Sequence, residues 1–286
     1  MDLKNKLKGL PPIYLLTLDE RPDRQEYTET QYDYWGISNY TKMSGSKYQL
    51  STYEDWKDLV ILNPPDENYN RKRHHIAEIS ITLAHLLNIK TWLEATNDPY
   101  VIIMEDDYDL SLIEHWHFDW TYLMNNIPYD WDCIQMSFEN ERAIPCFLHP
   151  ILPAHCTGAS LINRRYAEKI MHLHYIDGKF DLSQKISNWK WSKRGLGTPN
   201  FTTDYFLGHK GKTYCMPLIT VNSDIGSYAQ NILRKPERPD LVFTRKAYKK
   251  WWTTLRDRYT LDEFFTYGKP NDRVITSREP DINDYV

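Results

Sequence analysis

The sequence feature that most constrains the fold is an apolar run at residues 101–104 (Val-Ile-Ile-Met) that ends abruptly in carboxylates. A short continuous run of this kind is typical of a strand that is buried on both faces. Four carboxylates follow it within five residues: Glu105, Asp106, Asp107 and Asp109. Because like charges repel, such a cluster needs a counter-cation, and Mn²⁺ or Mg²⁺ prefers clustered carboxylate oxygens. Metal ions of this kind usually accompany phosphorylated substrates, so the cluster indicates an enzyme.

Within the cluster, Glu105 and Asp107 are the favoured metal ligands, with Asp106 as a further candidate. Alternate residues beyond a strand end can point the same way, so two carboxylates can reach one ion while a diphosphate completes its coordination. The alternative interpretation is a solvated acidic turn. The buried strand before the cluster favours the metal site, because a solvated turn needs no buried strand to position it.

The rest of the chain alternates between apolar runs and helical patterns. The predicted strands cover residues 13–18, 100–104, 132–137, 160–162 and 213–219, and the predicted helices begin near Pro22 and cover residues 76–95 and 164–173. This alternation predicts an α/β fold with a mixed, largely parallel sheet flanked by helices. In such sheets ligands bind at the carboxyl ends of the strands, which is where the acidic cluster lies. Residues 179–199 lose the pattern and are predicted to form a binding lid.

Composition excludes several classes of protein. A net charge of −4 argues against a dedicated nucleic-acid binder. The four cysteines form no Cys-x-x-Cys pair, so neither a zinc site nor a disulfide framework is indicated. No signal peptide and no run of about 20 apolar residues is present, which favours a cytoplasmic protein. The small size favours a bacterium or a virus-infected host cell as its setting.

The chain is predicted to form a catalytic domain over residues 1–230 and a helical extension over residues 231–286 that packs on it. Residues 234–258 hold nine Lys or Arg against three acids, interleaved with Tyr248, Trp251 and Trp252. One interpretation is a solvated helix whose aromatic side chains pack on the core. The other is a basic lip for a diphosphate, or for a lipid-linked acceptor in weak contact with a membrane surface.

Several blocks of the sequence, in order, resemble one enzyme family. The segment 14–24 (Tyr-Leu-Leu-Thr-Leu-Asp-Glu-Arg-Pro-Asp-Arg) is similar to the first strand and Arg-containing loop of glycosyltransferase family 25, which includes bacterial lipopolysaccharide and collagen galactosyltransferases. Met-Glu-Asp-Asp at 104–107 is similar to its Leu-Glu-Asp-Asp. Further blocks that match the family lie at 77–86, 130–134, 157–169 and 203–207, so the resemblance spans roughly residues 12–228.

The resemblance implies a GT-A (Rossmann-like) fold and transfer of a hexose, galactose or glucose, from a UDP-sugar to a hydroxyl of a glycan or glycolipid acceptor. It also implies Mn²⁺, with Mg²⁺ as a substitute, and inversion at the anomeric carbon. Arg21 and Arg24 are candidates for nucleotide contacts, because guanidinium groups suit phosphate and ribose oxygens. Their alternative is a surface pair with Glu20 and Asp23. The remaining candidates at the donor site are Leu18, Asp19, Ser44, Glu78 and His85, and those at the acceptor site are Thr157 and Trp191.

Inversion needs a base that deprotonates the acceptor hydroxyl, and Asp204 is the candidate. Its alternative is an N-cap for a helix at residues 205–207. Glu78 and His85 share one face of the long predicted helix with Thr82, so His85 either faces the donor or is a core histidine satisfied by a hydrogen bond. Ser44 stands where the family shows Asp, which puts the ribose or base contacts in doubt.

Two other functions stay open. One is nucleotidyl or phosphoryl transfer by the same acidic cluster with two metal ions. The other is a non-catalytic carbohydrate-binding protein whose carboxylates hold a structural calcium ion.

Overall fold

A computed structural model describes residues 5–46, 57–61, 75–137, 148–150, 158–183, 203–208, 210–225, 239–255 and 260–266. Its centre is a seven-stranded sheet in the order β2-β1-β4-β8-β6-β11-β7. β1 (Ile13–Thr17) is parallel to both neighbours, β2 (Tyr40–Ser44) and β4 (Tyr100–Glu105). β8 (Ala159–Asn163) runs antiparallel between β4 and β6 (Cys133–Gln135). β11 (Thr213–Cys215) is parallel to β6, and β7 (His149–Pro150) is antiparallel to β11.

Two small sheets accompany the central one. β10 (Lys179–Asp181) pairs in parallel with β3 (Val60–Ile61) and antiparallel with β9 (Tyr175–Ile176). β5 (Tyr108–Asp109) pairs antiparallel with β12 (Thr220–Val221). The prediction of a loop from residue 179 is therefore wrong for residues 179–181, because strand pairing on both sides holds them and Phe180 is buried. Residues 184–199 of the predicted lid lie outside the described part of the chain.

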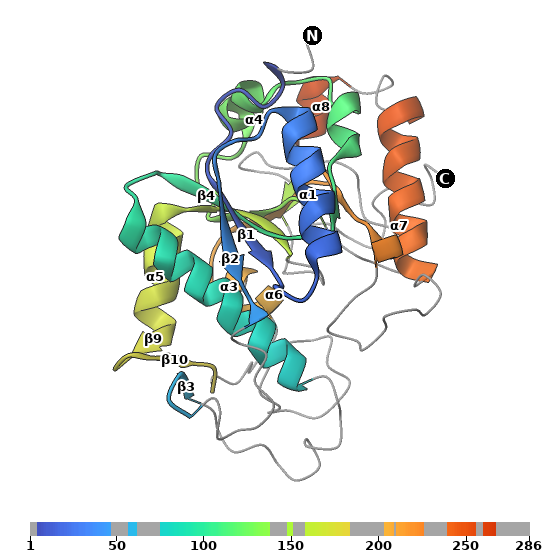
Figure 1. Ribbon diagram of the computed structural model, residues 1–286. Helices are drawn as coiled ribbons and strands as arrows, with labels where there is room; N and C mark the ends of the chain where they lie inside the picture. Colours follow the sequence, from blue (N-terminus) through green and yellow to red (C-terminus); the bar gives the residue numbers. More distant parts are fainter. Residues whose placement is uncertain are drawn as a thin grey trace.

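The helices cover both faces of the sheet (Figure 1). α1 (Pro22–Trp35) begins with a proline, which suits a first helical turn, and ends at Gly36 with a φ of 69°. α3 (His75–Ala95) and α5 (Arg164–His174) match their predicted positions. The remaining helical segments are η3 (Ser111–His115), α4 (Trp120–Asn126), α6 (Thr203–Gly208), η4 (Ser223–Ile225), α7 (Pro239–Lys250), η5 (Trp251–Leu255) and α8 (Leu261–Thr266).

The side chains of alternate residues in the central strands pack into two separate hydrophobic cores, one on each face of the sheet. Ile102 and Met104 of β4 belong to a cluster that includes residues of α1, α4, α7 and α8. Val101 and Ile103 belong to a second cluster with residues of α3, α5 and α6. Burial on both faces explains why β4 is a continuous apolar run. The mixed α/β, Rossmann-like architecture predicted from the sequence is confirmed.

The aromatic residues near the end of the described chain lie in the first of these cores. Tyr248, Trp251 and Trp252 are fully buried, and the indole Nε1 of Trp252 donates a hydrogen bond to the carbonyl of Pro217 at 2.8 Å. The interpretation that these rings pack on the core is confirmed. The predicted boundary at residue 230 lies outside the described residues. No helix in the described ranges is both long enough and apolar enough to cross a membrane.

Candidate functional site

The carboxyl ends of β1, β2 and β4 meet at one edge of the sheet. The register pairs Thr17 of β1 with Ser44 of β2, and Leu16 with Glu105 of β4, so the three parallel strands end almost level. Side chains that follow these strands are therefore neighbours, as the sequence predicted. An open parallel sheet with this arrangement commonly binds ligands at that edge.

The acidic cluster is a turn between β4 and β5. Glu105 is the last residue of β4, and β5 begins at Tyr108. The exposed fraction of the side chain is 29% for Glu105 and 15% for Asp107 but only 4% for Asp106. Glu105 and Asp107 are therefore accessible, whereas Asp106 is turned into the protein and is poorly placed to bind an ion from solvent.

Arg24 of α1 is the counter-cation of the two aspartates. Its Nη2 lies 3.0 Å from Oδ1 of Asp106 and 2.5 Å from Oδ2 of Asp107, and its side chain is only 6% exposed. Burial lowers the pKa of Arg24, but the charges of Asp107, Asp106 and Glu105 outweigh burial and raise it above its ordinary value. The guanidinium is therefore charged and forms ion pairs with both carboxylates. The interpretation of Arg24 as a surface partner of Glu20 and Asp23 is therefore wrong, whereas a contact between Arg24 and a nucleotide stays a prediction.

Burial also raises the pKa of the Asp106 carboxyl above its ordinary value, although the charge of Arg24 opposes that rise. A carboxylate in this position depends on its arginine, because an unpaired buried charge is costly. Asp106 and Arg24 therefore form an internal ion pair beneath the two accessible carboxylates.

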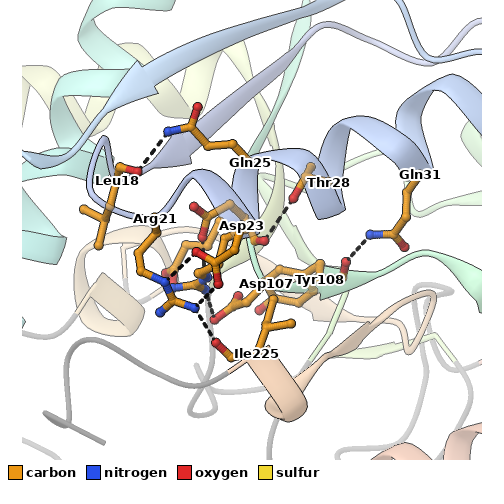
Figure 2. A network of polar contacts seen from close by, with 12 residues as sticks. Leu18, Arg21, Asp23, Gln25, Thr28, Gln31, Asp107, Tyr108 and Ile225 are labelled. Atoms are coloured by element: carbon orange, nitrogen blue, oxygen red, sulfur yellow. Dashed lines mark hydrogen bonds and ion pairs between the residues drawn. The ribbon is translucent and has the colours of Figure 1, made fainter. Parts of the chain in front are cut away.

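Two further residues on the same face of α1 hold the backbone of the acidic turn (Figure 2). The Thr28 hydroxyl donates to the carbonyl of Asp106 at 2.9 Å. The Gln31 amide donates to the carbonyl of Tyr108 at 2.9 Å and accepts from the backbone N–H of Leu110 at 2.8 Å. The sequence pattern did not identify Thr28 and Gln31 as part of the site. Their spacing from Arg24, four and seven residues, is nevertheless the spacing of residues on one helix face.

His85 of α3 reaches the acidic turn from the opposite face of the sheet. It is fully buried, and its Nε2 lies 2.9 Å from Oε1 of Glu105. Burial raises the pKa of Glu105, but the hydrogen bond and charge of His85 and the charge of Arg24 outweigh it, so the pKa lies below its ordinary value. The interpretation of His85 as a buried histidine satisfied by a hydrogen bond is confirmed, and its partner belongs to the acidic cluster; that His85 faces a donor stays a prediction.

Arg21, at the N-cap of α1, makes two contacts. Its guanidinium binds Asp23 through two hydrogen bonds of 2.9 and 2.7 Å and donates to the carbonyl of Ile225 at 2.6 Å (Figure 2). The predicted pair with Asp23 is confirmed, but the arginine side chain is only 12% exposed. The segment that ends at Ile225 also contacts the cluster, because the N–H of Asn222 donates to the carbonyl of Asp107 at 2.6 Å.

The rim of the site at β1 and β2 is polar and exposed. The Ser44 hydroxyl donates to Oδ2 of Asp19 at 2.7 Å, and the N–H of Asp19 donates to the Ser46 hydroxyl at 2.7 Å. The carbonyl of Leu18 accepts a hydrogen bond from Gln25. The sequence-predicted donor residues Leu18, Asp19 and Ser44 thus lie together at the end of the parallel strands, as expected.

The other predicted site residues are less well defined. Asp204 lies in the first turn of α6, which begins at Thr203. The alternative that Asp204 is the N-cap of this helix is therefore wrong. The side chain of Asp204 is outside the described part of the structure. A hydroxyl contact of 3.2 Å between Thr82 and Thr203 joins α3 to α6. Glu78 lies in α3, but its side chain is not among those described, and Thr157 and Trp191 lie outside the described residues.

Gly158 packs closely against Glu105 and Tyr108. Its carbonyl accepts a hydrogen bond from the N–H of Glu105 at 2.7 Å. A Cβ at position 158 would lie 2.7 Å from Oη of Tyr108 and 3.1 Å from Cδ of Glu105. Only a residue without a side chain allows so close an approach, which explains the glycine.

Gly158→Ala is therefore expected to cost about 1–3 kcal/mol of unfolding free energy through overpacking. Urea denaturation measures this cost. In a Tyr108→Phe background the cost should fall, because the closest atom is removed, and Tyr108→Phe alone is the control. An alanine variant as stable as the wild type would mean that Gly158 does not pack against Tyr108.

A divalent ion at this edge needs accessible oxygen ligands. No group of three or more His, Cys, Asp or Glu side chains that could hold a metal ion occurs within the described ranges. Glu105 and Asp107 offer two accessible carboxylates, so they fit an ion whose other ligands come from a bound diphosphate and water. Asp106 does not belong to this set, because it is buried against Arg24.

Comparisons with known proteins identify no family for this chain. No protein-family model matches the chain, and no curated protein matches it. Among solved structures, the chain is similar to one described as "Crystal Structure of A197 from STIV", with 9% sequence identity and a TM-score of 0.33 over 74% of this chain and 84% of that chain. A likeness this weak carries nothing about activity. The class of protein defined here is a mixed α/β, Rossmann-like fold with an acidic turn at the carboxyl edge of its parallel strands.

Proposed function

We propose that this protein is a metal-dependent inverting glycosyltransferase that moves a hexose, galactose or glucose, from a UDP-sugar to a hydroxyl of a glycan acceptor. The observation that carries the proposal is the pair of accessible carboxylates, Glu105 and Asp107, at the edge where three parallel strand ends meet. Nucleotides bind at this edge in many open α/β sheets. The sequence resemblance to family 25 supports the same conclusion independently.

In this proposal the residues at the carboxyl edge of the parallel strands have separate roles. Glu105 and Asp107 would hold the divalent ion, Mn²⁺ or Mg²⁺, and the ion would supply positive charge for the departing diphosphate. The exposed rim formed by Asp19 and Ser44 offers a carboxylate and a hydroxyl to the sugar hydroxyls of the nucleoside. Arg21, next to the same edge, adds a positive charge for the phosphates.

The chemical step needs a base on the acceptor side. As the acceptor oxygen bonds to the anomeric carbon, the bond to the diphosphate oxygen breaks, and the hydroxyl proton passes to the base. Asp204 is the proposed base. It lies on α6, which contacts α3 through Thr82 and Thr203, and α3 also carries His85, the partner of Glu105.

The test is incubation with UDP-galactose, UDP-glucose and UDP-N-acetylglucosamine, each with Mn²⁺ or with EDTA. We expect free UDP from at least one donor with Mn²⁺ and none with EDTA. Release of pyrophosphate in place of UDP would support nucleotidyl transfer. No turnover of any nucleotide sugar, with calcium bound tightly, would support a carbohydrate-binding protein.

A further inference from the structure

The ion pair of Arg24 is unusual for a purely structural contact. One guanidinium nitrogen, Nη2, contacts the carboxylates of two consecutive residues, Asp106 and Asp107. Arginine normally uses its planar fork in a bidentate way. Among the described residues the Nε of Arg24 has no hydrogen-bond partner, although the side chain is buried. A buried donor without a partner reduces stability, so the geometry is not explained by stability alone.

The contacts of α1 fix both the side chains and the backbone of the acidic turn. Arg24 holds the two aspartates, while Thr28 and Gln31 hold the carbonyls of Asp106 and Tyr108. Two adjacent aspartates without a counter-charge repel each other and turn apart. With Arg24 paired to both of them, Asp106 is buried and Asp107 stays partly exposed, as Glu105 is.

We propose that Arg24 is a positioning residue, which sets the orientation of Asp107 and so presents the Glu105–Asp107 pair to the divalent ion of the donor complex. This inference rests on the proposed function. Residues that orient metal ligands without touching the metal typically change metal affinity 10- to 100-fold when they are replaced.

The direction of the change in cation affinity when Arg24 is removed distinguishes a positioning role from a purely electrostatic one. Removal of a positive charge beside a cation site should strengthen cation binding if only Coulomb interactions matter. Loss of a positioning residue should weaken cation binding. Arg24→Met therefore gives opposite results under the two accounts.

The experiment measures Mn²⁺ binding by the electron paramagnetic resonance signal of free Mn²⁺, with and without saturating UDP, together with the melting temperature. Three variants are compared with the wild type: Arg24→Met, Arg24→Met/Asp106→Asn, and Lys90→Met. Lys90 forms an exposed ion pair with Glu94, so Lys90→Met controls for loss of a charge far from the site. The double variant removes the charge that Arg24→Met leaves unpaired, which keeps the test valid if the single variant fails to fold.

We expect Arg24→Met to melt at a lower temperature and to bind Mn²⁺ at least tenfold more weakly. The double variant should regain much of the melting temperature while its Mn²⁺ affinity stays at least tenfold below that of the wild type. Lys90→Met should leave Mn²⁺ affinity unchanged. Double-variant affinity equal to or tighter than that of the wild type would overturn the positioning role and leave the proposed function standing. A wild type that binds no Mn²⁺, with or without UDP, would overturn both.

Discussion

Replacing Asp107 by asparagine is expected to lower kcat/KM for donor turnover by about 100-fold or more. The variant keeps the size of the side chain and loses the charge that the divalent ion needs. Metal stabilisation of the leaving group contributes several kcal/mol, and about 1.4 kcal/mol corresponds to a tenfold change in rate. The measurement is Mn²⁺-dependent release of UDP at donor concentrations well below KM, where the rate reports kcat/KM.

Asp109→Asn is the matched control for this prediction. Asp109 belongs to the same acidic stretch, but its carboxylate accepts a hydrogen bond from the N–H of Ser111, two residues away. The same chemical change there should leave turnover within a few-fold of the wild type. Equal losses in both variants would mean that the total negative charge matters and that Asp107 has no particular role.

Trp252→Ala is expected to give the largest loss of stability, about 3–5 kcal/mol, the usual cost of truncating a buried aromatic residue. The indole is fully buried and packs against Trp251 and Phe264, at centroid distances of 4.8 and 5.6 Å. Its Nε1 also donates to Pro217, a hydrogen bond that alanine cannot make. The free energy of unfolding from urea denaturation measures the loss.

Tyr129→Ala controls for removal of an aromatic ring, because Tyr129 is 84% exposed. Surface substitutions of this kind usually change stability by about 0.5 kcal/mol or less. If Trp252→Ala cost as little as Tyr129→Ala, the helices at the end of the described chain would not share a core with the sheet.

The sequence predicted the parts of the site that depend on the order of strands. Apolar runs locate β1 and β4, and parallel strands bring their ends together, so the neighbourhood of Asp19 and Glu105 follows from the pattern, whereas Ser44 lies in β2, a strand that the pattern did not predict. The same reasoning predicted that Glu105 and Asp107 form a pair. Both carboxylates are partly exposed while Asp106 between them is buried, and their sharing of one ion stays a prediction.

The direction of individual side chains was not predictable in the same way. The position of Arg24 after β1 does not predict that the rotation of α1 about its axis turns this side chain toward Asp106 and Asp107 and away from the surface. Helix rotation depends on packing between residues distant in sequence, such as Tyr32, whose hydroxyl contacts the sulfur of Met104. No local pattern encodes that contact.

His85 shows that a helical pattern can predict burial without predicting the hydrogen-bond partner. Its helix position identified a buried face, and burial with a hydrogen bond was one alternative. The identity of its partner, Glu105, depends on how α3 crosses the sheet. The pattern predicts the helix and the strand, whereas their contact depends on tertiary packing.

The most direct test of the central claim is calorimetric titration of UDP into the wild type and into a Glu105→Gln/Asp107→Asn variant, each with Mn²⁺ or with EDTA. The account predicts that UDP binds the wild type at least tenfold more tightly with Mn²⁺ than with EDTA, and that the variant loses this dependence while it stays folded. UDP affinity that is the same with Mn²⁺ and EDTA, or a variant that keeps the full effect of Mn²⁺, would contradict a metal–diphosphate site at the acidic turn.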